Sequence, residues 1–349
     1  MIGLDAPFFY QRLDRHGMAQ RLRETPQDCL RGWQAAQEFP LPQELYRAKR
    51  ILFLGMGGSA IIGDFLQALA LAPVQVCREL SLPPGIDADT LVIASSFSGN
   101  TEETLSAFAQ ALETPARKLA LAGGGELAEI CRAKGVPLFL IDHPGPPRAT
   151  LAYSTLALAG IAARLGLLQI HRMDVVETAN LLDGMVAELD TASPTAQNPS
   201  KGLALRLYGR VPVIYGGDIL APVARRWKTE FNENAKAWAF YEVLPEAGHN
   251  AVVGYEFPRS QLLNATLLLL QSAEYSPRLR ARFRVAQEIL AQRGVSHEVV
   301  VARGQGALSQ MLSLVLLGDY TSYYLACLYQ VDPWPVDIID FWKKRLTEI

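Results

Sequence analysis

Gly55-Met56-Gly57-Gly58-Ser59-Ala60 follows the apolar run Ile51 to Leu54 directly, and this junction decides the fold. A second junction has the same form, because the apolar run Leu91 to Ala94 leads into Ser95-Ser96-Phe97-Ser98-Gly99-Asn100-Thr101. Each turn stands between a strand-like and a helix-like run. Such turns aim backbone N–H groups and small hydroxyls at one point, and the helix N-terminus behind them adds partial positive charge. The two turns therefore predict a socket for a phosphate group.

From Arg50 onward, short apolar runs alternate with longer helical patterns. The strand-like runs of the first half are 51–54, 74–77, 91–94, 119–122 and 137–141, and those of the second half are 212–215, 237–241, 266–271 and 297–301. Alternation of this kind is typical of parallel strands joined by crossover helices. The chain is therefore expected to be an α/β protein made of two units in tandem, each a parallel sheet flanked by helices.

Prolines and polar stretches divide the chain into four parts. Residues 1–45 have helical spacing and end near Pro40 and Pro42, so they form a helical lead-in. Residues 46–195 form the first unit, with an apolar helix from Ala149 to Leu168 and a polar linker helix to about Asp190. Polar, proline-containing residues 191–200 are typical of a linker. Residues 196–330 form the second unit, and 331–349 a C-terminal tail.

The amino-acid composition argues against nucleic acid and membrane surfaces as partners. The 349 residues carry 33 Lys+Arg against 35 Asp+Glu, so no broad basic field is available for nucleic acid or a membrane surface. The four cysteines lack metal-ligand spacing and are interpreted as core thiols of a reducing compartment. The N-terminus lacks the pattern of a signal peptide, and no apolar run is expected to span a membrane. We expect a cytoplasmic protein that uses no metal or cofactor.

The hydroxyl-rich turns have other interpretations. Gly55-x-Gly57-x-x-Ala60 also fits a dinucleotide fingerprint, with Glu79 near the place of a ribose-binding acid, or simply a tight strand-to-helix turn. Serine or threonine with glutamate three positions later is a capping box. Capping needs only one hydroxyl, whereas this chain clusters several. The cluster favours a phosphate site built from Gly57, Gly58, Ser59, Ser96, Ser98 and Thr101.

Three charged residues add chemistry to the phosphate socket. Arg148 follows a proline-rich loop where α/β sheets gather ligands, and it is either a surface salt-bridge partner or a stabiliser of an anionic intermediate. Glu233 stands between two asparagines, which are good orienters of a carboxylate. His249 lies in a glycine-containing turn and could instead be structural. A carboxylate base and a histidine beside a phosphate suit aldose–ketose isomerisation through an enediolate, with His249 opening the sugar ring.

At these residues the chain resembles the bifunctional phosphoglucose/phosphomannose isomerases, which are built from two sugar isomerase (SIS) domains. The matching segments, in family order, are GMGGSAIIGD (55–64), SSFSGNTEET (95–104), PPRATLAYS (146–154), FNENAKAW (231–238) and PEAGHN (245–250). The resemblance implies interconversion of glucose 6-phosphate and fructose 6-phosphate, with mannose 6-phosphate as a further substrate. It implies that the phosphate is held by the hydroxyls of Ser59, Ser96, Ser98 and Thr101. It also implies that Glu233 moves the proton between C1 and C2, and that His249 assists ring opening across a homodimer interface. It also implies roles for Arg148 and for Lys343.

The tail departs from the family. Family tails often read Asp-Pro-Thr-Pro-Val, with the threonine near the sugar, whereas this chain has Trp334 in the threonine's place. The bulky indole in this position is therefore expected to favour glucose phosphate over mannose phosphate. The alternative from another class is a sugar-phosphate-binding SIS regulator without catalysis, although sensing a phosphate would need neither Glu233 nor His249. The isomerase module of a glutamine-dependent amidotransferase also has two SIS domains, but its glutaminase domain begins with a cysteine where this chain has Met1-Ile2.

Overall fold

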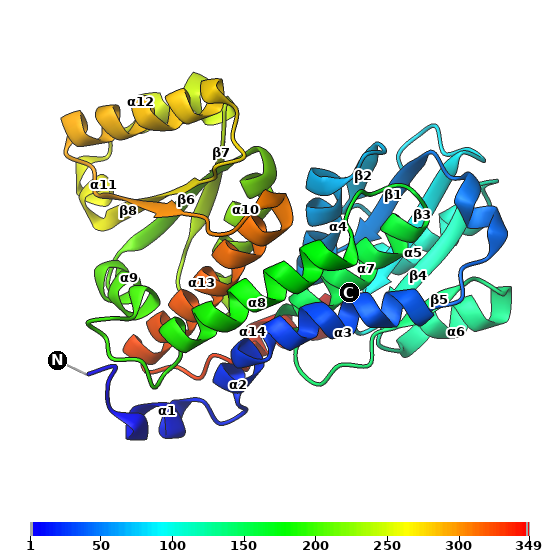
Figure 1. Ribbon diagram of the computed structural model, residues 1–349, viewed down its shortest axis with the longest axis horizontal. Coiled ribbons are helices and arrows are strands. Elements are labelled where there is room, and N and C mark those ends of the chain that lie inside the picture. The colour runs from blue at the N-terminus through cyan, green and yellow to red at the C-terminus, as the bar shows by residue number, and fades with distance from the viewer. Residues whose placement is uncertain (1–2, 347, 349) are drawn as a thin grey trace.

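The computed structural model describes residues 3–346 and 348 and contains two parallel sheets at opposite ends of the molecule (Figure 1). The first sheet has the strand order β2-β1-β3-β4-β5 and the second β7-β6-β8-β9, and every strand pair is parallel. Long helices run between the two sheets. The expected α/β fold, with two units that each place helices around a parallel sheet, is confirmed.

The first unit is a five-stranded sheet between two helical layers. Its side chains alternate, so that Phe53 and Ile93 pack toward α4 and α7 while Leu52 and Val92 pack toward α5 and α6. Burial on both faces requires the apolar runs that the sequence shows. The elements are β1 (Arg50–Gly55), α4 (Gly57–Leu69), β2 (Val74–Cys77), β3 (Thr90–Ser96), α5 (Glu102–Leu112), β4 (Arg117–Ala122), α6 (Gly125–Lys134), β5 (Leu138–Leu140), η2 (Pro147–Thr150) and α7 (Leu151–Arg164).

The second unit repeats this plan with four strands. In Figure 1, α12 covers one face of the sheet, and α10 and α13 lie on the other. The polar helix α8 leads into this unit from the first. The elements are α8 (Arg172–Leu189), α9 (Pro199–Leu207), β6 (Val211–Gly217), η3 (Asp218–Leu220), α10 (Ala221–Glu233), β7 (Phe240–Leu244), η4 (Glu246–His249), η5 (Ala251–Gly254), α11 (Arg259–Asn264), β8 (Ala265–Gln271), α12 (Pro277–Arg293), β9 (His297–Val301) and α13 (Gly306–Leu328).

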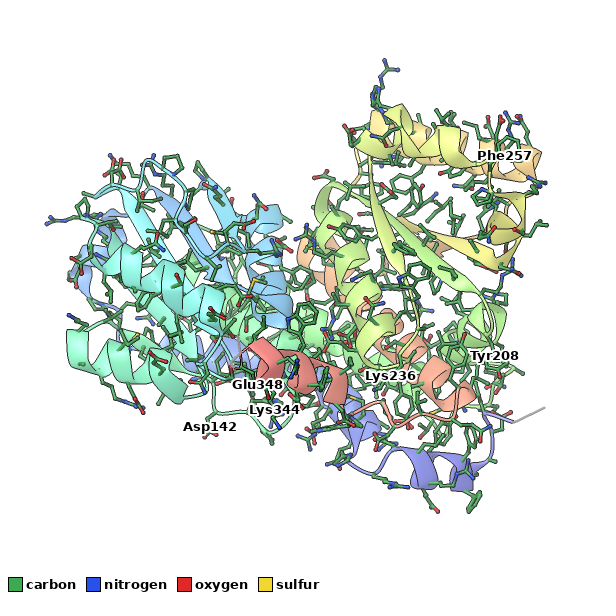
Figure 2. The ribbon with its side chains drawn as sticks, turned by 180° about the vertical axis from the view of Figure 1, so that it is seen from behind. Asp142, Tyr208, Lys236, Phe257, Lys344 and Glu348 are labelled. Atoms are coloured by element: carbon green, nitrogen blue, oxygen red, sulfur yellow. The ribbon has the colours of Figure 1, made fainter. Side chains whose placement is uncertain are left out.

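The N-terminal helices connect the two units. The helix α3 (Thr25–Glu38) packs along α7 and α8, while α1 (Pro7–Leu13) and α2 (Met18–Arg23) contact α13, and η1 (Gln43–Arg47) leads into β1. The buried Lys201 ammonium donates to the carbonyls of Thr191 (2.9 Å) and Ser193 (2.8 Å) and pairs with Asp5 (3.3 Å). The C-terminal helix α14 (Asp337–Leu346) lies across the junction of the two units, as Figures 1 and 2 both show.

Two expected elements differ from those observed. The strand expected at 237–241 begins later, as β7, because Lys236 takes a positive φ of 53° and Ala237 N–H bonds back to the carbonyl of Phe231 (3.0 Å). This backward bond closes the end of α10 before a strand can start. The apolar helix expected over 149–168 is shorter, since Gly166 adopts a φ of 74° just after α7.

The longest apolar helix differs from expectation as well. By length and composition, α13 is long and apolar enough to cross a membrane, contrary to the sequence-based expectation. All of its apolar window is buried inside the structure, as in the core helix of a globular protein. Its neighbours include α8, α9 and α10. The four cysteines are free and buried, which confirms that they are core thiols.

The contact between α3 and α7 predicts a sharp steric effect. A Cβ added at Gly32 would lie 2.1 Å from the carbonyl oxygen of Tyr153, which is backbone and cannot move aside cheaply. We expect Gly32→Ala to destabilise the protein by about 1–3 kcal/mol, because the two helices must separate. Urea denaturation followed by circular dichroism measures this change.

Gly184→Ala is the matched control. Gly184 lies within α8, and an added Cβ would meet nothing within 4 Å. Alanine is the better helix former by roughly 1 kcal/mol, so this variant should gain stability. Equal stabilities for the two variants would contradict the close α3–α7 contact.

Candidate functional site

Two turns meet at the carboxyl edge of the first sheet. Because β1 and β3 are neighbours, with Gly55 opposite Ser95, the chains that leave them run side by side. Ser59 Oγ accepts a hydrogen bond from Phe97 N–H (3.3 Å), which joins the first turn to the second. Gly57 has a φ of 51°, a conformation that glycine adopts without a Cβ penalty. The structure therefore brings Gly57, Gly58 and Ser59 beside the second hydroxyl-rich turn.

The hydroxyls of the second turn do not cap the helix behind them. Thr101 is the N-cap residue of α5, but its side chain makes no capping bond and instead shares a hydrogen bond with Ser96 Oγ (2.9 Å). Ser98 Oγ accepts from Asn100 N–H (3.2 Å). The N-cap residue of α4, Met56, has no capping side chain either. The capping-box interpretation is thus wrong, and both helix N-termini keep N–H groups for an anion.

Further hydroxyls lie beside the same edge. Ser95, Thr150 and Ser154 line a narrow cavity together with Gly58 and Ser59. Ser95 Oγ is buried and has no hydrogen-bond partner in the described structure. Sequence reasoning assigned these three residues no role, although two of them lie in the segment 146–154 that resembles the family. Their place in the turn and in that segment was the available signal.

Arg148 is the buried charge of the site. Its side chain is 3% exposed, so the interpretation as a surface salt-bridge partner is wrong. Its Nε donates to Asn234 Oδ1 (2.8 Å), and its Nη2 donates to the carbonyls of Pro333 (2.8 Å) and Trp334. The residue comes from the first unit, whereas its acceptors come from the second unit and the tail. One guanidinium therefore joins three parts of the chain.

Glu233 lies directly beside Arg148. It is the last residue of α10, and its Oε2 is 3.5 Å from Arg148 Nη1. About a quarter of the side chain is exposed (26%), so the carboxylate is open to a ligand as well as paired with the arginine. A carboxylate in this position can accept a proton next to a fixed positive charge.

The flanking asparagines do not orient this carboxylate as expected. Asn234 is buried, and it accepts from Arg148 and donates to Glu230 Oε2 (2.9 Å) and Ser322 Oγ (2.9 Å). Asn232 Nδ2 donates to the carbonyl of Ala237 (2.9 Å) and shapes the following loop. Because both asparagines are used elsewhere, they place the arginine and the loop rather than Glu233.

A buried ionic cluster supports Asn234 and Arg148. Arg226 Nη1 pairs with Glu230 Oε1 (2.6 Å), and its Nη2 bonds Asp319 Oδ2 (3.1 Å) and the carbonyl of Arg148 (2.8 Å). Burial raises the pKa of Glu230 to about 8, although Arg226 opposes the shift, and burial also raises the pKa of Asp319. The spacing of Arg226 and Glu230, i and i+4 on the apolar face of α10, was the sequence signal for this cluster.

Lys236 holds the same tail from another side. Its ammonium, labelled in Figure 2, donates to the carbonyls of Glu233 (2.8 Å) and Asp332 (2.9 Å). Trp334, the next tail residue after Pro333, stacks on the His16 ring (5.6 Å between centroids), and His16 Nδ1 lies 3.3 Å from Asp332 Oδ2. The turn that supplies the acceptors of Arg148 is thus fixed by His16 of the lead-in and by Lys236 of the loop after α10.

Two predicted site residues are not joined to this centre within one chain. His249 is exposed at the end of η4 and lines a separate cavity with Arg278 and Arg282 of α12. Lys343 is exposed on α14. Within residues 3–346 and 348, no group of three or more His, Cys, Asp or Glu side chains could hold a metal ion.

The two parallel sheets, each flanked by helices, have the fold of SIS domains. A solved structure of this fold, a glucose-6-phosphate isomerase-like protein from Thermus thermophilus, aligns with a TM-score of 0.65 at 23% identity, over 96% of this chain and 98% of that one. Residues 196–346 match the family model described as the bacterial phospho-glucose isomerase C-terminal SIS domain.

Sequence comparison defines the family within this fold. The bifunctional phosphoglucose/phosphomannose isomerase of Caldicellulosiruptor bescii is 34% identical over 95% of this chain and 99% of its own length. The enzyme of the same name from Aquifex aeolicus is 32% identical over 88% of this chain and 93% of its own length. The chain belongs to the bifunctional phosphoglucose/phosphomannose isomerase family.

The raised pKa of Glu230 predicts a pH-dependent contribution to stability. An unfolded glutamate loses its proton near pH 4.5, whereas in the folded protein Glu230 keeps it to about pH 8. Between these values the folded state binds more protons than the unfolded state, so stability falls as pH rises. We expect the free energy of unfolding of the wild type, relative to Glu230→Gln, to decrease from pH 5 to pH 8. Denaturant titrations across this range test it, and a constant difference would contradict the shift.

Proposed function

We propose that this chain isomerises the 6-phosphates of glucose and mannose to fructose 6-phosphate by moving a proton between C2 and C1 through an enediolate. The observation that carries the proposal is Glu233, a partly open carboxylate 3.5 Å from the buried guanidinium of Arg148. The first of the two proposed anion-binding turns lies next to the backbone of Arg148, because an added Cβ at Gly58 would be 3.8 Å from the Arg148 backbone nitrogen.

Each side chain has a task in this reaction. The hydroxyls of Ser59, Ser96, Ser98 and Thr101, with the backbone at Gly57 and Gly58, hold the phosphate, which does not react. Glu233 removes the proton from C2 of the open-chain aldose and returns it to C1, while a proton moves from O2 to O1. Arg148 is buried, so its charge stabilises the enediolate oxygen without screening by water.

His249 and Lys343 lie outside the site around Arg148 and Glu233, and each is proposed to have a role in the reaction. We infer that the active species is a homodimer in which His249 reaches the site of the partner subunit and assists ring opening. Its exposure and its distance in the fold from the phosphate turns support this arrangement. Sedimentation velocity measures the dimer. Lys343 is proposed to approach the sugar from the tail.

The cellular setting follows from the chemistry and the thiols. Four free, buried cysteines suit a reducing compartment, so we propose a cytoplasmic enzyme of carbohydrate metabolism that serves glycolysis or gluconeogenesis. The proposed proton transfer between C2 and C1 uses the carboxylate of Glu233 and needs no metal or cofactor.

The base assignment gives the first functional prediction. We expect Glu233→Gln to abolish isomerisation while phosphate affinity stays nearly intact, because the amide keeps the size of the side chain but cannot accept the C2 proton. Exchange of the substrate C2 hydrogen with solvent deuterium, followed by NMR, reports this step directly. The same experiment separates an enzyme from a binding regulator, which would show no exchange even in the wild type.

Glu246→Gln is the matched control for this experiment. Glu246 is a glutamate of the second unit, as Glu233 is. It is exposed and accepts a hydrogen bond from Asn250 (2.8 Å). It should exchange at the wild-type rate. If exchange of the C2 hydrogen survives in Glu233→Gln and disappears in Glu246→Gln, the base is Glu246 and not Glu233.

Epimer preference gives the second prediction. We expect Trp334→Thr to raise the ratio of mannose to glucose phosphate activity, because it restores the family's small hydroxyl. Arg148 bonds the carbonyl of residue 334 and not its side chain, so the arginine keeps its acceptor. Discrimination by fit is worth about 1–3 kcal/mol, so the change should be roughly a hundred-fold or less.

His16→Ala is the control for Trp334→Thr. It removes the ring that stacks on Trp334 but keeps the indole. If both variants shift the ratio of mannose to glucose phosphate activity equally, the effect comes from lost packing of the tail and not from the hydroxyl. Coupled assays with the two sugar phosphates measure the ratio.

A further inference from the structure

The loop before Arg148 carries a buried histidine that the proposed reaction does not use. His143 is 3% exposed, and its Nε2 lies 2.9 Å from Oδ1 of Asp28, which is 1% exposed. Asp28 belongs to α3, 115 positions earlier in the chain. A buried imidazole–carboxylate contact between a loop and a distant helix fixes the loop at that point, because a buried polar group is costly without its partner.

The helix that receives this contact is itself rigidly placed. At Gly32, one turn after Asp28, α3 approaches the backbone of α7 so closely that a Cβ would clash with Tyr153. At its end, the Arg164 guanidinium of α7 donates to the carbonyls of Ala36 (2.5 Å) and Phe39 (2.6 Å). The loop is thus attached to α3 through His143, and it runs directly into η2 and α7 at its other end. The two packed helices therefore hold both ends of the segment that contains Arg148.

Three of the four residues between His143 and Arg148 are prolines. The segment reads Pro144-Gly145-Pro146-Pro147, and each proline fixes its own φ and has no N–H to bond elsewhere. The Ala149 N–H bonds the carbonyl of Pro146 (2.9 Å), which closes the turn at η2. Gly145, with a φ of 130°, is the one residue of this stretch with a free backbone, and the prolines on either side of it limit how much of a displacement at His143 is absorbed before it reaches Arg148. Figure 2 labels Asp142, at the start of this loop.

The surroundings of His143 add a second observation. Arg31 also bonds Asp28 Oδ1 (2.5 Å), and the Tyr153 ring lies 5.5 Å from the imidazole between centroids. The Nδ1 atom of His143 is buried without a hydrogen-bond partner in the described structure. A histidine that served only stability would be expected to have a hydrogen-bond partner at both ring nitrogens. Leaving Nδ1 of His143 buried without one costs folding free energy.

We propose that His143 is a positioning residue: its hydrogen bond to Asp28 fixes the proline-rich loop, and the loop in turn places the Arg148 guanidinium against its acceptors and Glu233. This inference rests on the proposed role of Arg148 in the isomerisation. Arg148 acts on the enediolate and not on the phosphate, so loss of the anchor should lower kcat and leave KM nearly unchanged.

Two amide substitutions form a matched pair for the test. Glutamine places its amide nitrogen where His143 Nε2 lies and can still donate to Asp28, whereas asparagine is too short to reach it. We expect His143→Asn to lower kcat for fructose 6-phosphate roughly ten- to a hundred-fold, the usual effect of a misplaced catalytic group. His143→Gln should stay within a few-fold of the wild type. Similar kcat values for the two variants would overturn the proposal.

A stability control separates positioning from simple destabilisation. Thr178→Val removes a buried hydrogen bond to Ser309 (2.7 Å) between α8 and α13, away from the loop. It should lower the melting temperature as His143→Asn does but leave kcat unchanged. A fall in kcat that follows melting temperature across all three variants would overturn the positioning role.

The decisive test is whether the effect of His143→Asn on kcat depends on Arg148. In an Arg148→Lys background the guanidinium contacts are already lost, so His143→Asn should reduce kcat far less than in the wild type. Full additivity would overturn the proposal. A crystal structure of His143→Asn provides a readout independent of activity, since Arg148 should leave Asn234. If the wild type shows no isomerisation while this displacement is seen, the proposed function fails and the positioning of Arg148 stands.

Discussion

The burial of one guanidinium organises the molecule. Arg148 is 3% exposed, and an arginine cannot lose its charge, so each of its donors needs an acceptor inside the protein. Nε and Nη2 donate to an asparagine at the end of α10 and to two carbonyls of the tail, and Nη1 faces Glu233. The first unit, the second unit and the tail must therefore meet at one point for this charge to be stable.

The surrounding charges make that meeting point rigid. Arg226 bonds the carbonyl of Arg148 and is shared by Glu230 and Asp319, while Asn234 connects Glu230 to the Arg148 side chain. These contacts occupy the side chains of Arg226 and Asn234. Glu233, at the open end of the cluster, is the carboxylate left beside the arginine and accessible to a substrate.

Much of the fold could be predicted from the pattern of apolar runs. Parallel strands buried on both faces must be almost continuously apolar, so runs such as 51–54 and 91–94 are unambiguous. The start of β7 could not be predicted in this way, because it depends on the left-handed conformation of Lys236 and on a bond back to Phe231. The burial of α13 likewise depends on helices far away in the sequence.

The sequence by itself determined the two hydroxyl-rich turns and the identities of the charged residues, because turn geometry and chemical type are local properties. Only the tertiary structure decided that Asn234 serves Arg148 and not Glu233, and that Thr101 bonds Ser96 instead of capping α5. It also decided that Trp334 contributes its carbonyl to the site while its ring stacks on His16. The physical reason is that a hydrogen bond or an ion pair depends on which partners the fold brings within about 3 Å, and many of these partners lie far apart in the sequence.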